Sequence, residues 1–254
     1  MHKAGFRALA GAIALGGMLA AAVPATAADK TARTRVIGVE GVAKGNADRR
    51  VEVLVRVPAG KSARSEGDRA LAAQGAVRAA APQAARYTFT GLRWDVLPVR
   101  QSYNGAGSRA AAAQTALTNT YPDWSSVSGS RFRITSGGTT SRCPSLVQEC
   151  PGAQRNDGFN DVGWARLANG TLGVTWSTSG RDEADMAINT RYTWSTGCVN
   201  RAGQIDLETV LLHENGHVAG LGHSTDVTAV MYPSYQSARC TLAADDRAGI
   251  AALY

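Results

Sequence analysis

The stretch His213-Glu214-Asn215-Gly216-His217-Val218-Ala219-Gly220-Leu221-Gly222-His223 decides what this chain can be. It follows Asp206, a good helix N-cap, and apolar residues that recur at helical spacing. On a helix, His213 and His217 stand one turn apart on the same face, so both imidazoles can reach one ion. Gly220 can end the helix because glycine adopts positive φ freely, and the chain can then return His223 from another direction.

Three imidazoles leave a fourth position open on a tetrahedral metal ion, which is typical of catalytic zinc and not of closed structural zinc. Glu214 follows the first ligand, so its carboxylate is expected beside that open position. There it can take a proton from a zinc-bound water whose pKa the metal has lowered. The pattern therefore predicts a zinc-dependent endopeptidase with metal ligands His213, His217 and His223 and with Glu214 as the general base.

Two other functions fit parts of this pattern. A zinc hydrolase that cuts another amide, such as a cell-wall peptide, would use the same residues. A non-catalytic secreted zinc-binding module would need a fourth protein ligand, and none is obvious in the sequence. Asp226 lies near the motif but reads as a loop or capping residue.

The motif His-Glu-x-x-His-x-x-Gly-x-x-His resembles the metzincin signature. Met231 resembles the methionine of the Met-turn of that family, and Pro233, two residues later, resembles the matrixin version of the turn. The resemblance implies an α+β zincin fold, a twisted mixed sheet that is mostly parallel with one antiparallel edge strand, and three long helices. It also implies that an extended substrate pairs with an edge strand above the cleft, for which Gly170, Thr171, Leu172 and Gly173 are the candidates. Cleavage specificity is then expected to come from one pocket below the metal.

The sequence departs from animal matrixins in two ways. No histidine remains for the second, structural zinc of those enzymes. Their pro-segment blocks the metal through a cysteine, whereas residues 28–86 contain none. An inhibitory segment here would act sterically or through an acid such as Asp48 or Asp68. Bound calcium is possible but unsupported, since the acids at 157, 161, 182, 183 and 185 match no defined calcium loop.

The N-terminal third of the chain differs from the rest. Residues 1–27 have a basic start, an apolar run and Ala25-Thr26-Ala27, which is typical of a cleaved signal peptide. Residues 28–86 are predicted to be a pro-segment with a strand at Val51–Val57 and a helix from Ser65 to about Ala80. Residues 87–254 are the predicted catalytic domain. We therefore expect a secreted, extracellular and monomeric protein that acts on a protein or peptide and does not bind a membrane once the leader is removed.

The net charge of +7 does not indicate a nucleic-acid partner. Residues 28–86 hold twelve basic and six acidic residues, whereas residues 87–254 hold thirteen and fourteen. The Ala- and Arg-rich composition, with no lysine after Lys61, is consistent with a GC-rich genome and a bacterial type of enzyme.

Four cysteines in an exported chain predict two disulfides, for which three connectivities exist. We favour Cys143–Cys150, which closes a short loop, and Cys198–Cys240, which brackets the motif. In the catalytic region, strands are expected at 87–93, 96–102, 131–135, 162–167, 171–177 and 186–195. Helices are expected from Ser108, as N-cap, to about Thr120 with Pro122 just beyond, from Asp206 to Ala219, and from Ala243 to Leu253.

Overall fold

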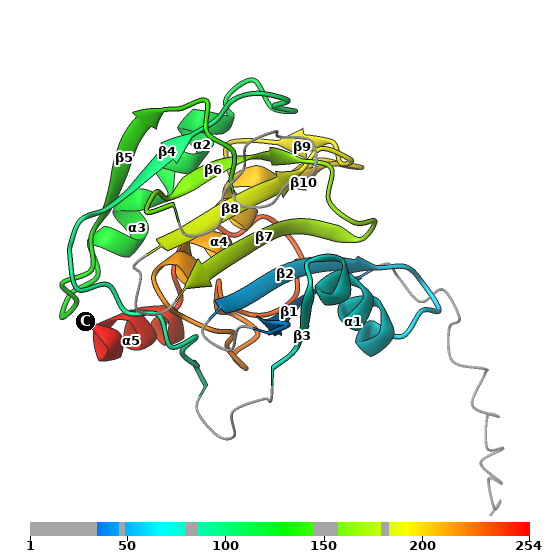
Figure 1. The fold of residues 1–254 in the computed structure, drawn as a ribbon, viewed down its shortest axis with the longest axis horizontal. Coiled ribbons are helices and arrows are strands. Elements are labelled where there is room, and N and C mark those ends of the chain that lie inside the picture. The colour runs from blue at the N-terminus through cyan, green and yellow to red at the C-terminus, as the bar shows by residue number, and fades with distance from the viewer. Residues whose placement is uncertain (1–34, 46–48, 80–85, 145–156, 179–182) are drawn as a thin grey trace, which may run out of the picture. The chain divides into compact units, whose positions relative to one another are not determined.

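The fold is seen in a computed structural model that describes residues 35–45, 49–79, 86–144, 157–178 and 183–254. All of them belong to one compact unit, Arg33–Tyr254. Its centre is a mixed sheet in which eight strands follow the order β3-β1-β2-β7-β8-β6-β4-β5 (Figure 1). The expected signal peptide, residues 1–27, lies outside the described residues. Within them, no helix combines the length and the apolar character needed to cross a bilayer.

Seven described strands come from the predicted catalytic region: β9 (Trp194–Ser195) and β10 (Ile205–Asp206) pair with each other, and the other five join the large sheet. The strands β4 (Val99–Tyr103), β5 (Ile134–Thr139), β6 (Asp161–Ala165) and β8 (Glu183–Asn189) are parallel, and β7 (Thr171–Thr178) runs antiparallel to β8. Together with the helices they confirm an α+β fold with a mixed sheet. The strand expected at 87–93 is absent and only an isolated bridge, Phe89 to Leu221, forms there.

The other three strands come from the segment ahead of residue 87. They are β1 (Arg35–Ala43), β2 (Arg49–Val57) and β3 (Ala76–Arg78), all antiparallel to their neighbours, and β2 pairs with β7. Four of the seven strand pairings in this sheet are therefore antiparallel. A mostly parallel sheet with β7 at its edge is therefore not confirmed for the sheet that the described residues form, because the N-terminal strands extend it beyond β7.

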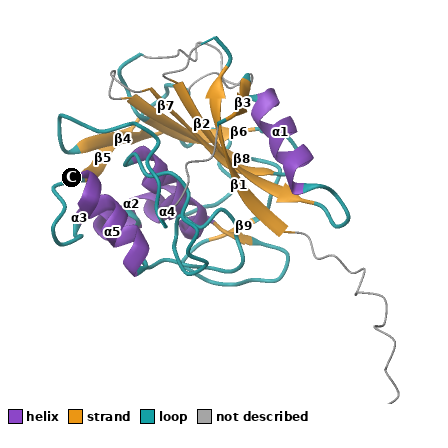
Figure 2. Cartoon of the chain, turned by 90° about the horizontal axis from the view of Figure 1, so that it is seen from below, coloured by secondary structure: helices purple, strands orange, loops and turns teal. Residues whose placement is uncertain are grey.

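Helices cover both faces of the sheet (Figure 2). The helices α2 (Ala113–Asn119), α3 (Tyr121–Ser125), α4 (Leu207–Val218) and α5 (Ala244–Leu253) lie on one side, and α1 (Ala63–Ala73) lies on the other. Each side has its own apolar core. In β2, Val51, Val53, Val55 and Val57 join the core on the α1 side, so the alternate residues, Glu52 and Leu54, point to the α4 side.

Two predicted helices differ from the observed ones. The helix expected from Ser108 starts only at Ala113, has no side-chain cap, and is followed by α3, which carries Pro122 in its first turn. Proline is tolerated there because the first amides of a helix have no partner within the helix. The expected three long helices are therefore not confirmed in this region. In the N-terminal segment, α1 ends at Ala73 because Gly75 adopts a φ of 67°, and the chain then enters β3.

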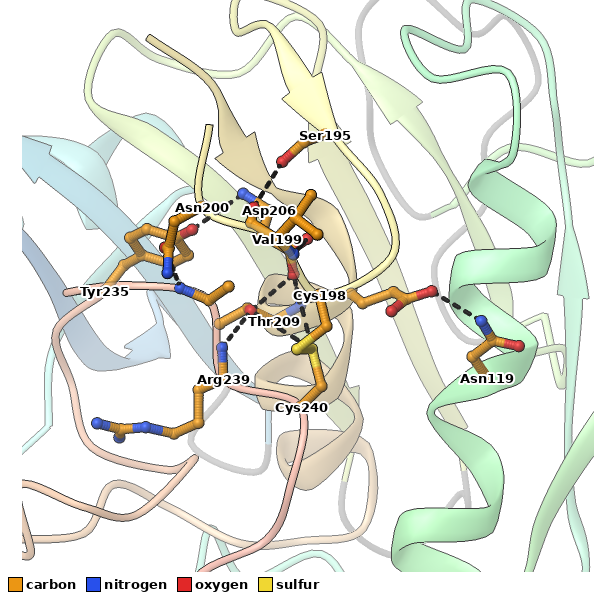
Figure 3. The surroundings of a disulfide bond; sticks show 12 residues. Asn119, Ser195, Cys198, Val199, Asn200, Asp206, Thr209, Tyr235, Arg239 and Cys240 are labelled. Carbon is orange, nitrogen blue, oxygen red and sulfur yellow. Dashed lines mark hydrogen bonds between the residues drawn. A yellow bond between two sulfur atoms is a disulfide. The ribbon is translucent and has the colours of Figure 1, made fainter. Parts of the chain in front are cut away.

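One of the two expected disulfides lies within the described residues (Figure 3). Cys198 and Cys240 are bonded, with their Cα atoms 5.9 Å apart and 42 residues apart in sequence. Beside them, Asp206 accepts hydrogen bonds from the amides of Val199 and Thr209, and the amide of Arg239 donates to Thr209 Oγ1. The bond thus joins the start of α4 to the segment before α5. The Cys143–Cys150 prediction cannot be compared, since Cys150 lies outside the described residues.

Replacing both Cys198 and Cys240 with serine is expected to lower the free energy of unfolding by about 4 kcal/mol, because the unfolded chain regains the entropy that a loop of this length withholds. Urea unfolding followed by tryptophan fluorescence measures this change. An unchanged transition midpoint would contradict a stabilising role for the bond.

Candidate active site

Two of the three predicted metal ligands are fixed by α4. Asp206 caps this helix by accepting a hydrogen bond from the amide of Thr209, as expected, and Gly220 ends it with a φ of 94°. His213 and His217 face each other with their Nε2 atoms 3.0 Å apart. The ring centroid of His223 lies 5.3 Å from that of His213 and 4.8 Å from that of His217. The structure therefore brings the three predicted ligands together.

The hydrogen bonds of the Nδ1 atoms of His213 and His217 determine whether their Nε2 atoms can bind a metal ion. The Nδ1 atoms of His213 and His217 lie 2.8 Å from the carbonyl oxygens of Val230 and Leu221. A carbonyl oxygen can only accept, so each Nδ1 carries the hydrogen and donates it. Burial lowers the pKa of His213 to about 3 and the pKa of His217 well below its ordinary value, so both rings are neutral. Their Nε2 atoms then carry no hydrogen, and the lone pairs of these two atoms face each other.

Two facing lone pairs repel unless a cation lies between them. The third ring presents the same chemistry, since the Nε2 atom of His223 is buried without a hydrogen-bond partner. The Nδ1 atom of His223 lies 3.0 Å from the carboxylate of Glu40. Three imidazole nitrogens with their outer atoms anchored are the donor set that a zinc ion takes in an open site, so these residues fit the metal.

Glu214 lies next to this donor set and is buried, with 1% of its surface exposed. Thr175 Oγ1 on β7 donates a hydrogen bond of 2.5 Å to Oε2 of Glu214, and Oε1 has no partner. Burial raises the pKa of Glu214 to about 8, against the lowering effect of the Thr175 hydrogen bond. A divalent cation nearby would favour the carboxylate and lower that pKa again. Glu214 is thus placed to exchange a proton near neutral pH.

Met231, the residue that resembles the Met-turn methionine, is buried and packs against Gly216 of α4. Asp246 on α5 holds this turn, because its carboxylate accepts hydrogen bonds from the amides of Val230 and Met231. It also accepts one from Ala243, the residue before α5. The sequence analysis missed Asp246 and Thr175, and only the position of Asp246 in the first turn of a helix could have indicated a capping acid.

Gly216 shows why a residue with low helix propensity lies inside α4. A Cβ atom at this position would overlap Met231 Sδ and lie 2.9 Å from Trp124 Cζ2. At this position α4 therefore packs directly against Met231 and Trp124.

Gly216→Ala is expected to destabilise the protein by about 1–3 kcal/mol, because this contact leaves no room for a methyl group. Thermal unfolding measures the change, and Gly105→Ala is the matched control, since a Cβ atom there would meet only Tyr103 Cε1 at 3.4 Å. Equal melting temperatures for the two variants would refute the packing argument.

A pocket opens beside His213. Its lining includes Val210 and His213 from α4, Val230 and Tyr235 from the Met-turn region, and Leu54 from β2. The sequence analysis expected one pocket below the metal but could not name its residues. Leu54 comes from a segment to which no role in this pocket was given.

The predicted substrate strand, Gly170 to Gly173, leads into β7 and runs past Glu214. A Cβ atom at Gly173 would lie 2.9 Å from Glu214 Oε1. In this chain, however, the outer side of β7 is already paired with β2: Thr171 lies opposite Val55, and Thr175 lies opposite Glu52. The candidate strand is therefore not a free edge among the described residues.

The acids considered for calcium have other partners. Asp161 pairs with Arg142 at 2.9 Å and Glu183 accepts a hydrogen bond from the amide of Gly158. Asp185 accepts one from the amide of Asp161. Asp226, read as a capping residue, accepts from the amide of Thr228 in a turn. Asp182 lies outside the described residues.

Comparison with known proteins places this site in a family. The model of the family described as Matrixin matches residues 101–254, which is more than half of the chain. The chain belongs to the matrixin family. This matrixin is 32% identical to metalloendoproteinase 1 of Glycine max over 151 residues, which is 56% of this chain and 45% of that protein. It is 30% identical to the interstitial collagenase of Equus caballus over 184 residues, which is 70% of this chain and 36% of that protein.

The matched region of this matrixin begins within β4 and contains β5 to β10, all of the candidate site on α4 and the Met-turn. It leaves out the strands β1, β2 and β3. The matched part of this chain spans less than half the length of each of these two relatives.

Proposed function

We propose that this chain is a secreted zinc-dependent endopeptidase. The observation that carries the proposal is the juxtaposition of three imidazoles, two with Nε2 atoms 3.0 Å apart, and a buried carboxylate with one unpartnered oxygen. His213, His217 and His223 would hold the zinc ion. The names of the relatives, metalloendoproteinase and interstitial collagenase, agree with this reading.

A bound zinc ion supplies a Lewis acid that polarises the scissile carbonyl and acidifies water. Glu214 then accepts a proton from the attacking water at Oε1 and passes it to the departing amine. Thr175 keeps the other carboxylate oxygen in place, so the free oxygen faces the reacting atoms. Burial of the site excludes bulk water, which strengthens each of these electrostatic interactions.

The substrate is proposed to be a protein or peptide in extended form, paired with Gly170 to Gly173 and the rest of β7. Main-chain pairing of this kind gives affinity with little sequence preference. The preference would come from the pocket beside His213, where Val210 and Val230 offer apolar contacts to an aliphatic side chain. A nucleic-acid or membrane partner is not part of the proposal, and the protein would act as a monomer.

The proposed processing gives residues 1–27 as a signal peptide, residues 28–86 as a pro-segment and residues 87–254 as the catalytic domain. Removal of the first two parts would leave the family-matched region and its site intact. It would also expose the outer side of β7 and open the pocket that Leu54 lines.

The decisive experiment is casein hydrolysis by the purified chain after limited proteolysis, with the new N-terminus determined by sequencing. We expect hydrolysis to fall by about a hundredfold or more with a chelator and to return on addition of zinc, because the reaction depends on the metal. A peptidoglycan fragment serves as the alternative substrate. Casein hydrolysis that the chelator leaves unchanged would eliminate the proposed function.

A further inference from the structure

The N-terminal hairpin, formed by β1 and β2, lies in the place that the proposed function assigns to the substrate. We propose that this hairpin is an internal inhibitor that fills the substrate cleft and is held at the metal site by the contact of Glu40 with His223. The inference rests on the proposed function, which it extends by naming the inhibitory residues.

The first contact is with the strand that would bind substrate. β2 pairs antiparallel with β7 from Arg49 opposite Thr178 to Val55 opposite Thr171 (Figure 1). An exposed edge strand takes up an extended peptide through these same backbone groups. While β2 is in place, β7 has no free edge for another chain.

The second contact closes the opposite side of the cleft. β1 pairs with β2, and the amide of Gly38 on β1 donates a hydrogen bond of 2.5 Å to the carbonyl of Pro233 in the Met-turn region. Gly38 also packs directly on the metal site, because a Cβ atom there would overlap His223 Nε2. The two strands therefore fill the strip between β7 and Pro233.

The third contact is with the pocket. The pairing of β2 with β7 shifts register between Val53 and Val55, which places an extra residue of β7 opposite Leu54. The Leu54 side chain, 3% exposed, lines the pocket beside His213 and Val210. An aliphatic side chain of the hairpin thus forms one wall of the pocket proposed for a side chain of the substrate.

Two carboxylates of the hairpin face the catalytic groups. Glu40 lies opposite Glu52, and Glu52 lies opposite Thr175, which holds Glu214. Glu40 accepts a hydrogen bond of 2.5 Å from the amide of His223 and lies 3.0 Å from its Nδ1 atom. Hydrogen bonds to a charged acceptor contribute more than neutral ones, so this pair holds β1 to the third metal ligand.

Glu40 acts on a predicted metal ligand and not on the metal itself. The acids named from the sequence do not take this role. Asp68 pairs with Arg78, away from the site, and Asp48 lies outside the described residues. Sequence spacing could not single out Glu40, because its position beside His223 depends on pairing between segments 183 residues apart.

The hairpin also contains a buried group that favours its release. Glu52 is 2% exposed, one of its oxygens has no hydrogen-bond partner, and the carboxylates of Glu40 and Glu214 are near it. Burying such a group costs free energy, and the cost is recovered when the hairpin moves into water. Backbone pairing and Glu40 therefore hold the hairpin on the cleft, whereas the burial of Glu52 disfavours that position.

The test compares the intact wild-type chain with intact Glu40→Gln and Gly38→Ala chains. The control variant is Glu66→Gln, which removes an acid from the exposed Arg69 pair on α1 in the same segment. A fluorogenic peptide measures cleavage, and mass spectrometry verifies that each chain is intact. Amide hydrogen exchange of the zinc-free proteins measures how often β1 and β2 open, independently of activity.

Loss of a charge-assisted hydrogen bond is expected to shift the equilibrium between the docked and the released hairpin by about tenfold or more. We therefore expect both site variants to cleave the peptide at least about tenfold faster than the intact wild type. Exchange in β1 and β2 should rise by a similar factor, with β6 and β8 unchanged. Glu66→Gln should behave as the wild type. After proteolytic removal of residues 1–86 all four chains have the same sequence, so their rates should be equal.

Two results would overturn the inference: an intact wild-type chain as active as the processed chain, or folded site variants with wild-type exchange in β1 and β2. A processed chain that binds zinc but cleaves nothing would instead refute the proposed function, and the exchange data would still decide whether the hairpin is held by Glu40.

Discussion

Glu214→Gln is expected to lower kcat/KM for peptide cleavage by the processed chain by about 10²- to 10⁴-fold, which is the usual contribution of a positioned general acid–base group. The amide keeps the size of the side chain and can still meet Thr175, but it cannot take a proton from water. Zinc content should stay at one ion per chain, because Glu214 is not one of the three nitrogen donors. Steady-state kinetics together with metal analysis measures both quantities.

Glu208→Gln is the matched control for this experiment. Glu208 lies on the same helix and binds Asn119, away from the histidines, so its loss should leave kcat/KM within about twofold. A Glu214→Gln enzyme with wild-type kcat/KM would show that the base is another residue. Loss of zinc from that variant would show that Glu214 also has a role in binding the metal.

His217→Ala is expected to raise the dissociation constant for zinc by about a hundredfold or more and to abolish measurable cleavage. Structural zinc sites bind with about 10–16 kcal/mol in total, so each ligand carries a large share. His217 is also the ligand that faces His213 at 3.0 Å, and its removal leaves a cavity that the buried surroundings cannot fill. Competition with a chromophoric chelator measures the dissociation constant.

The Glu214→Gln chain is the comparison for the His217→Ala chain, since both carry one change on α4 and only one should lose zinc. Circular dichroism verifies that both remain folded. If the His217→Ala chain binds zinc as tightly as the wild type, the metal is held elsewhere and the three-histidine assignment is wrong.

The parts of the fold that sequence could predict depend on local chemistry. The cap at Asp206, the end of α4 at Gly220 and the placement of the three histidines follow from helix geometry and from the positive φ of glycine. The pairing of Cys198 with Cys240 was favoured because it brackets the motif, and the structure confirms it.

The features that sequence could not predict depend on pairing between distant segments. The alternating valines of β2 indicated a strand but not that β7 would be its partner, 120 residues later in the chain. The Ala-rich run after Ser65 favoured a longer helix, but β3 pairs with β1 and takes its last residues. Pro122 read as a helix stop, although the first turn of a new helix accepts it equally well.

The bond between Cys198 and Cys240 makes the segment between them a closed covalent ring. That ring carries Glu214, the three histidines and Met231. A single cut in the turn after His223 would open the ring without releasing either half. Glu214 and the three histidines would then stay covalently joined to Met231 through the disulfide.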